Sequence, residues 1–136
     1  MRYLILAVPL LLIACHKPAE TAPAAAPATV SADDGWNGKY EGDLRVEVTG
    51  TPGAHKVSLL TATPDCTGDI GLSDGGVAAS ADDATALNVS LDTDGKGECE
   101  VTLSRNGDKL TSSETVECAQ FHGATCSFNG TATRVK

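Results

Sequence analysis

The chain has 136 residues and carries 10 Lys and Arg against 18 Asp and Glu, a formal net charge of −8 at pH 7. A surface this acidic repels nucleic acid and anionic lipid headgroups, which argues against both as partners, and it attracts cationic proteins. Aromatic residues make up only 4% of the sequence, so a folded domain of this size has a lean core and benefits from additional cross-links.

The chain begins with a short apolar segment behind one positive charge. Arg2 precedes the uncharged run 3–13, which as a helix would span about 17 Å, well short of the roughly 30 Å hydrocarbon core of a membrane. The run leads into Leu12-Ile13-Ala14-Cys15, which resembles the lipobox of bacterial lipoproteins. We therefore interpret residues 1–14 as a lipoprotein signal peptide. The alternative is an ordinary secretory peptide that leaves a free thiol at Cys15.

The lipobox resemblance implies a location as well as a modification. It implies a diacylglyceryl group on the Cys15 sulfur and a further fatty acid, such as palmitate, on the new amine. Two or more acyl chains hold a protein stably at a membrane, so the implied protein is anchored without spanning the bilayer. His16 stands where an Asp would favour retention in the inner membrane of a Gram-negative cell. The resemblance thus implies an outer-membrane lipoprotein that faces the periplasm.

Residues 15–35 predict an extended tether. Pro18, Pro23 and Pro27 lie among alanines, a composition that favours polyproline II at about 3.1 Å per residue and disfavours a helix. Such a segment could carry a domain on the order of 60 Å from a membrane. We expect the folded domain to occupy residues 36–136.

Four cysteines remain after Cys15, and an even number in an exported chain predicts two disulfides. They are Cys66, Cys99, Cys118 and Cys126. Three pairings are possible; we favour Cys66–Cys99 with Cys118–Cys126, because the second pair closes a short glycine-containing loop. The sequence has no C-x-x-C pair and no suitably spaced histidines, so we expect no metal and no cofactor.

The longest pattern in the chain is an alternation that starts at Trp36. Apolar residues and glycines fall on one parity from Trp36 to Val48, and polar residues fall on the other up to Thr49. A period of two over this length predicts a half-buried β-strand. Gly38 and Gly42 lie on the inward parity, where a missing side chain lets a strand bend sharply around a small barrel.

Weaker alternations follow at short and fairly even spacing. Asn106-Gly107 between two of them is a strong hairpin signal. With the first run they predict about eight strands and no long helix, hence an all-β domain: a small antiparallel meander barrel, with a β-sandwich as the alternative. The expected later strands centre on residues 56–59, 70–72, 77–81, 87–92, 99–104, 109–116 and 128–133.

A tryptophan on the first strand and a basic residue on the last favour the barrel. Trp36-x-Gly38-x-Tyr40 and Phe128-x-Gly130-x-Ala132 share a bulky residue followed by a glycine, and Arg134 falls on the inward parity. This arrangement resembles the end-closing device of the calycin superfamily, which includes lipocalins and avidins. The resemblance implies that the first and last strands pair and that Trp36 and Arg134 close one barrel end. Gly35 directly precedes Trp36, whereas those proteins carry Gly-x-Trp.

The segment between the last two cysteines is the best candidate for binding. A disulfide around residues 119–125 would hold Phe121 and His122 rigidly at an exposed tip, which suits an interface anchor. The alternative is that Phe121 folds inward and closes one end of the barrel while His122 only solvates the turn. The sequence shows no spacing of Ser, Asp and His that indicates a nucleophile and its base, so we expect no enzymatic activity.

Two functions of different kinds fit these observations. The first is a lipid-anchored protein-binding module of the cell envelope, whose layout resembles bacterial inhibitors of host lysozyme, although Ser73-Asp74-Gly75 does not match that family's Ser-Gly motif and Tyr40 is the only tyrosine after Cys15. An acidic surface would be steered toward a cationic envelope or host protein. The second is a periplasmic small-ligand carrier with its pocket in the barrel. A structural envelope lipoprotein is a further alternative.

Overall fold

The computed structural model describes residues 33–136. The expected signal peptide, the expected lipidation site Cys15 and almost all of the expected tether lie outside the described residues. Within them, nine strands, one 3-10 turn and one short helix follow in chain order. They are β1 (Gly38–Gly42), β2 (Leu44–Thr51), β3 (Ala54–Thr61), β4 (Asp69–Ile70), β5 (Val77–Asp83), β6 (Ala86–Asp92), β7 (Glu98–Asn106), β8 (Lys109–Glu114), η1 (Val116–Cys118), α1 (Ala119–His122) and β9 (Gly130–Arg134).

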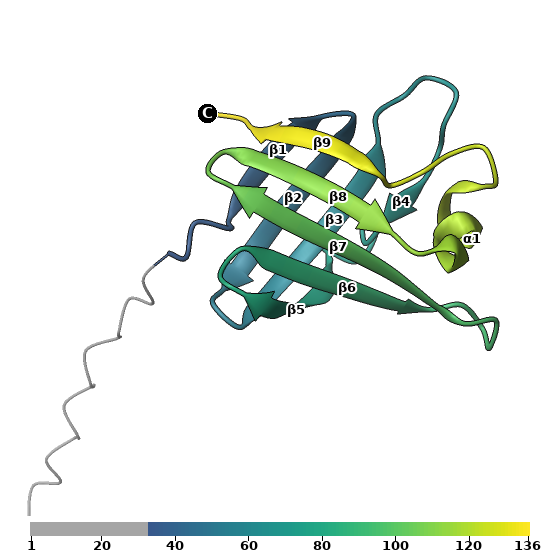
Figure 1. Cartoon of the computed structure of the whole chain (residues 1–136), viewed down its shortest axis with the longest axis horizontal. Coiled ribbons are helices and arrows are strands. Elements are labelled where there is room, and N and C mark those ends of the chain that lie inside the picture. Colours follow the sequence, from purple (N-terminus) through teal and green to yellow (C-terminus); the bar gives the residue numbers. More distant parts are fainter. Residues whose placement is uncertain (1–32) are drawn as a thin grey trace, which may run out of the picture.

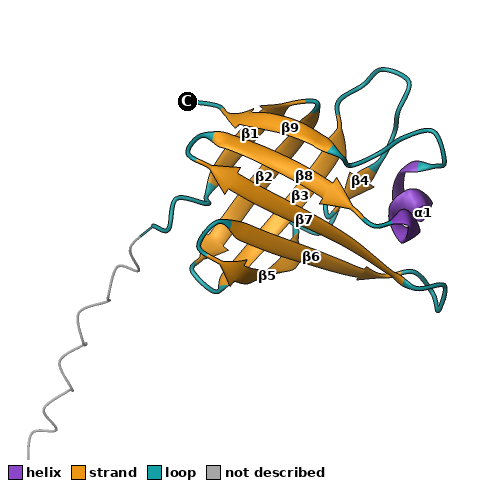
Figure 2. Cartoon of the chain, viewed as in Figure 1, coloured by secondary structure: helices purple, strands orange, loops and turns teal. Residues whose placement is uncertain are grey.

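The strands form one closed antiparallel barrel, which confirms the predicted fold class and excludes the sandwich (Figures 1 and 2). Hydrogen-bonded neighbours run in the order β2-β1-β9-β8-β7-β6-β5-β3, and pairing of β2 with β3 closes the circle. The two-residue β4 pairs only with β3, on the side that β5 occupies further along. First and last strands pair as expected, with Tyr40 opposite Arg134.

The long alternation from Trp36 is not one strand, as the sequence analysis expected, but two. The chain reverses at Asp43, and β1 pairs with β2 so that Glu41 lies opposite Arg45. Alternation continues through the reversal because Tyr40 and Val46 are direct cross-strand partners and both point inward. Gly42 permits the close approach of β1 to β9: a Cβ there would lie 2.4 Å from the carbonyl oxygen of Thr131.

The barrel interior is filled by side chains on the predicted inward parity. The largest fully buried ones are aromatic or branched and are less than 2% exposed: Trp36, Tyr40, Phe128, Leu44, Leu59, Leu87, Leu103, Leu110, His55, Val48, Val57 and Val89. At about 25 cal/mol per Å² of apolar area removed from water, such a core is the main source of stability.

The two ends of the barrel differ. The Trp36 end carries Asp33, the hairpin turns between β2 and β3, β5 and β6, and β7 and β8, and the C-terminus (Figure 1). The His122 end carries the connections 62–68 and 93–97 and the segment 115–129, which contains η1 and α1 (Figure 2). Among residues 33–136, no helix has the length and apolar character that a membrane-crossing helix requires.

Both disulfides lie at the His122 end, and their pairing differs from the expected one. Cys66 pairs with Cys126 and Cys99 with Cys118, at Cα–Cα distances of 5.5 and 4.5 Å. The cause is strand register: the amide of Thr115 donates to Glu100 O, 3.0 Å away, which carries the following 3-10 turn over the start of β7 and brings Cys118 to Cys99. The favoured Cys118–Cys126 loop therefore does not form.

Candidate functional site

The Trp36 end is closed by two arginines rather than one. Arg134 stacks on the ring of Tyr40, 4.8 Å from its centroid, and its guanidinium donates to the carbonyl oxygens of Gly35 and Asn37 and to the Tyr40 hydroxyl. Arg105 lies over the ring of Trp36, 5.0 Å from its centroid.

Arg134 thus binds the backbone on either side of Trp36, whereas the cation that stacks on the indole is Arg105. Arg105 was not among the residues expected at this end. Its inward parity, which continues Cys99, Val101 and Leu103, is the signal that could have found it. Arg105 also donates to Asp34 O at 2.9 Å, so this end of the barrel is held by hydrogen bonds across its mouth.

Tyr40 sits between these groups with no exposed surface. Its hydroxyl donates to Trp36 O at 3.0 Å and accepts a hydrogen bond from Arg134. Burial raises the pKa of the Tyr40 phenol above 10.0, and the nearby positive charges of Arg134 and Arg105 reduce the increase. The phenol is therefore a neutral hydrogen-bonding group of the barrel end.

A second contact at this end joins Asp34 to the buried His55. Asp34 Oδ2 lies 2.7 Å from His55 Nε2, and the histidine side chain is only 1% exposed. Burial raises the pKa of Asp34, but the hydrogen bonds from His55 and the Trp36 amide outweigh it and leave the pKa below 3.8. The contact fixes residues 33–36 across the mouth of the barrel.

The His122 end is closed by a buried polar network. His122 Nε2 lies 2.9 Å from Glu114 Oε2, and His122 Nδ1 lies 2.6 Å from Gly123 O. Glu114 Oε1 accepts hydrogen bonds from Ser127 Oγ at 2.6 Å and from Asn129 Nδ2 at 3.4 Å. The side chains of His122 and Glu114 are 4% and 8% exposed. Glu114 therefore links α1 to the start of β9.

Phe121 and His122 do not stand at an exposed tip. Phe121 is partly buried and packs against the core, and His122 packs edge-on against Phe128 at 4.8 Å between ring centroids. A Cβ on Gly68 would lie 2.3 Å from His122 Cβ, so the 62–68 connection also presses on the histidine. Phe121 packs inward, as the alternative prediction had it, but His122 is buried and does not merely solvate the turn. Both side chains help to close this end.

The network at the His122 end contains Ser, His and Glu, but not in the order that nucleophilic catalysis uses. The Ser127 hydroxyl donates to Glu114 instead of His122. Both ring nitrogens of His122 already face acceptors, one on Glu114 and one on Gly123. A base must accept the proton of its nucleophile, and this histidine is not placed to do so for Ser127. Within residues 33–136, no group of three or more His, Cys, Asp or Glu is arranged to hold a metal ion.

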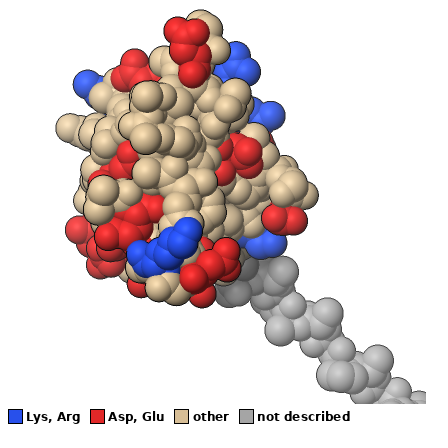
Figure 3. Space-filling view, turned by 90° about the vertical axis from the view of Figure 1, so that its right-hand side faces the viewer, with Lys and Arg blue, Asp and Glu red and all other residues tan. Residues whose placement is uncertain are grey.

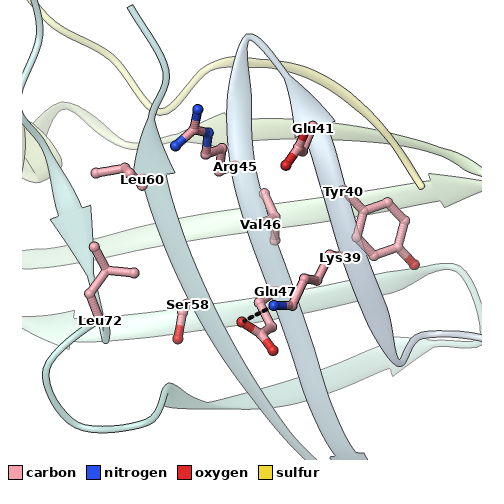
Figure 4. Close-up of a pocket in the computed structure, with 9 residues that line it drawn as sticks. All are labelled: Lys39, Tyr40, Glu41, Arg45, Val46, Glu47, Ser58, Leu60 and Leu72. Carbon is pink, nitrogen blue, oxygen red and sulfur yellow. Dashed lines mark ion pairs between the residues drawn. The ribbon is translucent and has the colours of Figure 1, made fainter. Parts of the chain in front are cut away.

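A shallow groove lies on the outside of the barrel, across β1, β2 and β3 (Figure 4). The groove consists of two adjoining hollows of about 220 and 280 Å³, and Glu47, Ser58 and Leu72 line both. Figure 4 shows the charged side chains of β1 and β2 beside two leucines, with Lys39 and Glu47 joined by an ion pair of 3.9 Å. The leucines are Leu60, from β3, and Leu72, from the loop before β5.

The connections at the His122 end are mostly acidic. Figure 3 views this end, where acidic side chains outnumber basic ones around a neutral centre. Connections and strand termini there carry a single Lys, at position 96, against the acidic residues Asp43, Asp65, Asp69, Asp92, Asp94, Glu98 and Glu117. No family model, curated protein or solved structure matches the chain.

Proposed function

We propose that the protein is a lipid-anchored module of the cell envelope that binds another protein through its surface. The observation that carries this choice is the filled barrel: the interior side chains are buried and pack against one another, so they leave no room for a ligand of the kind a carrier would hold. Both mouths are also occupied, one by Trp36 with Arg105 and the other by His122 with Glu114. A small-ligand carrier needs a concave, largely preformed pocket, and this interior argues against one.

The charge distribution supports a cationic partner. Residues 33–136 carry eight Lys and Arg against seventeen Asp and Glu, and the His122 end has one Lys among its acidic residues. A patch of one sign steers an oppositely charged protein and raises its association rate. This end lies opposite the end that carries Asp33, so on an anchored protein it would face away from the membrane (Figure 1).

The proposed binding is tested by retention of proteins from an envelope extract on the immobilised full chain. The test variant neutralises three charges at the His122 end: Asp94→Asn, Glu98→Gln and Glu117→Gln. The control neutralises three at the Trp36 end: Asp33→Asn, Asp82→Asn and Asp108→Asn. We expect the retained proteins to be cationic, to elute with salt because screening weakens exposed charge pairs, and to be lost only with the first variant. Equal retention by both variants would contradict the proposal.

An inhibitor of lysozyme is a special case of this function. Lysozymes are cationic, and titration of a lysozyme with the full chain measures the inhibition directly. Full lysozyme activity at an equimolar excess removes this case while leaving the wider proposal standing.

The lipid anchor is tested separately, by intact-mass spectrometry of protein extracted from native membranes. We expect a chain that begins at Cys15 and carries diacylglyceryl and fatty-acyl mass. The variant Cys15→Ser should lose the membrane attachment. A chain that begins elsewhere, or that lacks acyl mass, would contradict the anchor.

A further inference from the structure

The outer face of β1, β2 and β3 differs in charge from the rest of the domain. Three cations, Lys39, Arg45 and Lys56, lie on it with two acids, Glu41 and Glu47. The rest of residues 33–136 carries five Lys and Arg against fifteen Asp and Glu. Two copies of so acidic a protein repel each other at most approaches, and this face, which has no excess of negative charge, is where they can meet.

The charges on this face are arranged as a checkerboard. Lys39 on β1 lies directly opposite Glu47 on β2, and Glu41 on β1 lies directly opposite Arg45 on β2. Figure 4 shows the four side chains in two rows on the same surface. Directly opposite residues have Cβ atoms about 5 Å apart, so the four charges form a compact square of alternating sign.

A two-fold rotation makes this square complementary to itself. An axis parallel to the strands, between β1 and β2 and midway between two copies, lays β1 of each copy over β2 of the other. Lys39 then faces Glu47 of the second copy, and Glu41 faces its Arg45. Every charge meets one of opposite sign, which is the condition for an isologous contact. Rotation about an axis parallel to the strands also preserves strand direction, so the Asp33 residues of both copies stay at the same end.

Exposed apolar side chains flank the row that contains Lys39 and Glu47. Leu72 is 50% exposed beside Ser58, whose hydroxyl donates to Gly71 O at 3.2 Å and whose Cα pairs with that of Glu47. Val135 is 48% exposed and lies on the other side of the row, beside Lys39, to whose carbonyl oxygen its amide donates at 2.8 Å. The row therefore reads Leu72, Ser58, Glu47, Lys39, Val135.

The same rotation carries Val135 of one copy toward Ser58 and Leu72 of the other. Those two residues line both hollows of the groove, which together have room for a branched apolar side chain. Of the three exposed large hydrophobic residues in the described part of the chain, two thus lie in one row across this face. The third, Val116, lies at the His122 end.

From this combination we propose that the β1–β2–β3 face binds the same face of a second copy of this chain, with Lys39–Glu47 and Glu41–Arg45 pairs across the two-fold axis and Val135 in the groove beside Leu72. Three strands about 4.8 Å apart and eight residues of about 3.4 Å bury about 400 Å² per copy. An interface of about 800 Å² in total is at the weak end for specific contacts, so the dissociation constant is on the order of micromolar to millimolar. The pairing goes beyond the proposed function and does not depend on it.

Sedimentation equilibrium of the full chain, at concentrations up to about 1 mM, measures the pairing. The single variant Arg45→Glu creates two like-charge contacts across the axis, and we expect dimerisation to weaken at least about tenfold. The double variant Glu41→Arg with Arg45→Glu restores opposite charges within and between copies, and we expect it to return to within about twofold of the unmodified chain. Leu72→Asp should also weaken dimerisation, whereas Val116→Asp, the matched control, should not.

Cross-linking identifies the contact itself. Ordinary and heavy-nitrogen-labelled chains are mixed and treated with a carbodiimide, which joins an ammonium to a neighbouring carboxylate with no spacer. A Lys39–Glu47 peptide that carries one ordinary and one heavy half is expected, and only a contact between copies can produce it. The Lys39–Glu47 ion pair within each chain yields peptides of a single label in any case. A monomer at every concentration, a double variant no better than Arg45→Glu, equal effects of Leu72→Asp and Val116→Asp, or the absence of mixed-label Lys39–Glu47 peptides would each overturn the proposal.

Discussion

Two replacements of the buried Glu114 distinguish what its charge contributes to stability from what its hydrogen bonds contribute. Glu114→Ala removes the partner of His122 Nε2 and the acceptor of Ser127 Oγ. The side chains of Glu114 and His122 are 8% and 4% exposed, so water replaces these contacts poorly. Breaking one partner of a buried pair costs about 3–5 kcal/mol of unfolding free energy, and we expect Glu114→Ala to fall in that range.

Glu114→Gln keeps the shape and can keep every hydrogen bond. A Gln carbonyl oxygen can accept from Ser127 and Asn129, while its amide can donate to a neutral His122 whose Nδ1 donates to Gly123. We therefore expect Glu114→Gln to cost only about 1 kcal/mol, because an apolar environment stabilises a neutral, fully hydrogen-bonded pair as well as a charged one.

The assay is urea unfolding followed by tryptophan fluorescence, since Trp36 is the only tryptophan. Glu98→Ala, an exposed acidic residue at the same end, is the matched control and should change stability by less than about 0.5 kcal/mol. If Glu114→Ala costs less than about 1 kcal/mol, the network does not hold this end closed. If Glu114→Gln costs as much as Glu114→Ala, the negative charge matters and our reasoning from hydrogen bonds is refuted.

Three further outcomes are expected. Peptide mapping without reduction should find Cys66–Cys126 and Cys99–Cys118, and a Cys118–Cys126 peptide would contradict the register argument. Alanine replacement of both cysteines of a pair should lower the free energy of unfolding by about 4 kcal/mol for the first pair, which spans 60 residues, and by about 3 kcal/mol for the second, which spans 19. The pKa of Asp34 is below 3.8 in the folded state, so its contribution to stability is present above pH 3.8 and is lost as the pH falls through the lowered pKa; acid unfolding of Asp34→Asn should lack this part, and an unchanged profile would exclude it. The pKa of Tyr40 is raised above 10.0, so stability should decline as the pH rises from 10.0 through the raised pKa. Tyr40→Phe loses the hydrogen bond to Trp36 O at a cost of about 1 kcal/mol and should remove that decline in alkaline unfolding curves.

Alternation in the sequence predicted the class of fold and most of the core, because each strand of a small barrel has one buried face. Leu87 with Val89, and Val101 with Leu103, are buried as their parity requires. The expected hairpin joins β7 and β8, with the turn at Gly107-Asp108 and Asn106 paired with Lys109. These features depend only on residues near one another in the chain, which is why sequence reasoning reaches them.

The disulfide pairing depends on residues that are distant in the chain. Closing a loop of eight residues instead of sixty changes the chain entropy by only about 2 kcal/mol, and the position of η1 over β7 easily outweighs such a difference. The same limit applies to Glu114, whose role appears only when β8, α1 and the segment before β9 are brought together. Nothing in its local sequence distinguishes it from the exposed glutamates.

The hairpin at Asp43 explains why the outer face also escaped prediction. A reversal that keeps the alternation intact is invisible to a pattern of period two, so Lys39, Glu41, Arg45 and Glu47 look like the solvated side of one strand. Because the chain reverses at Asp43, residues on either side of the turn become cross-strand partners. Lys39 then lies opposite Glu47 and Glu41 lies opposite Arg45, so each pair carries opposite charges. A repeated order of charges about a turn, basic then acidic before it and basic then acidic after it, places opposite charges across from each other in a two-stranded hairpin. The alternating charge pattern of this face can therefore be predicted from the sequence once the position of the turn is known.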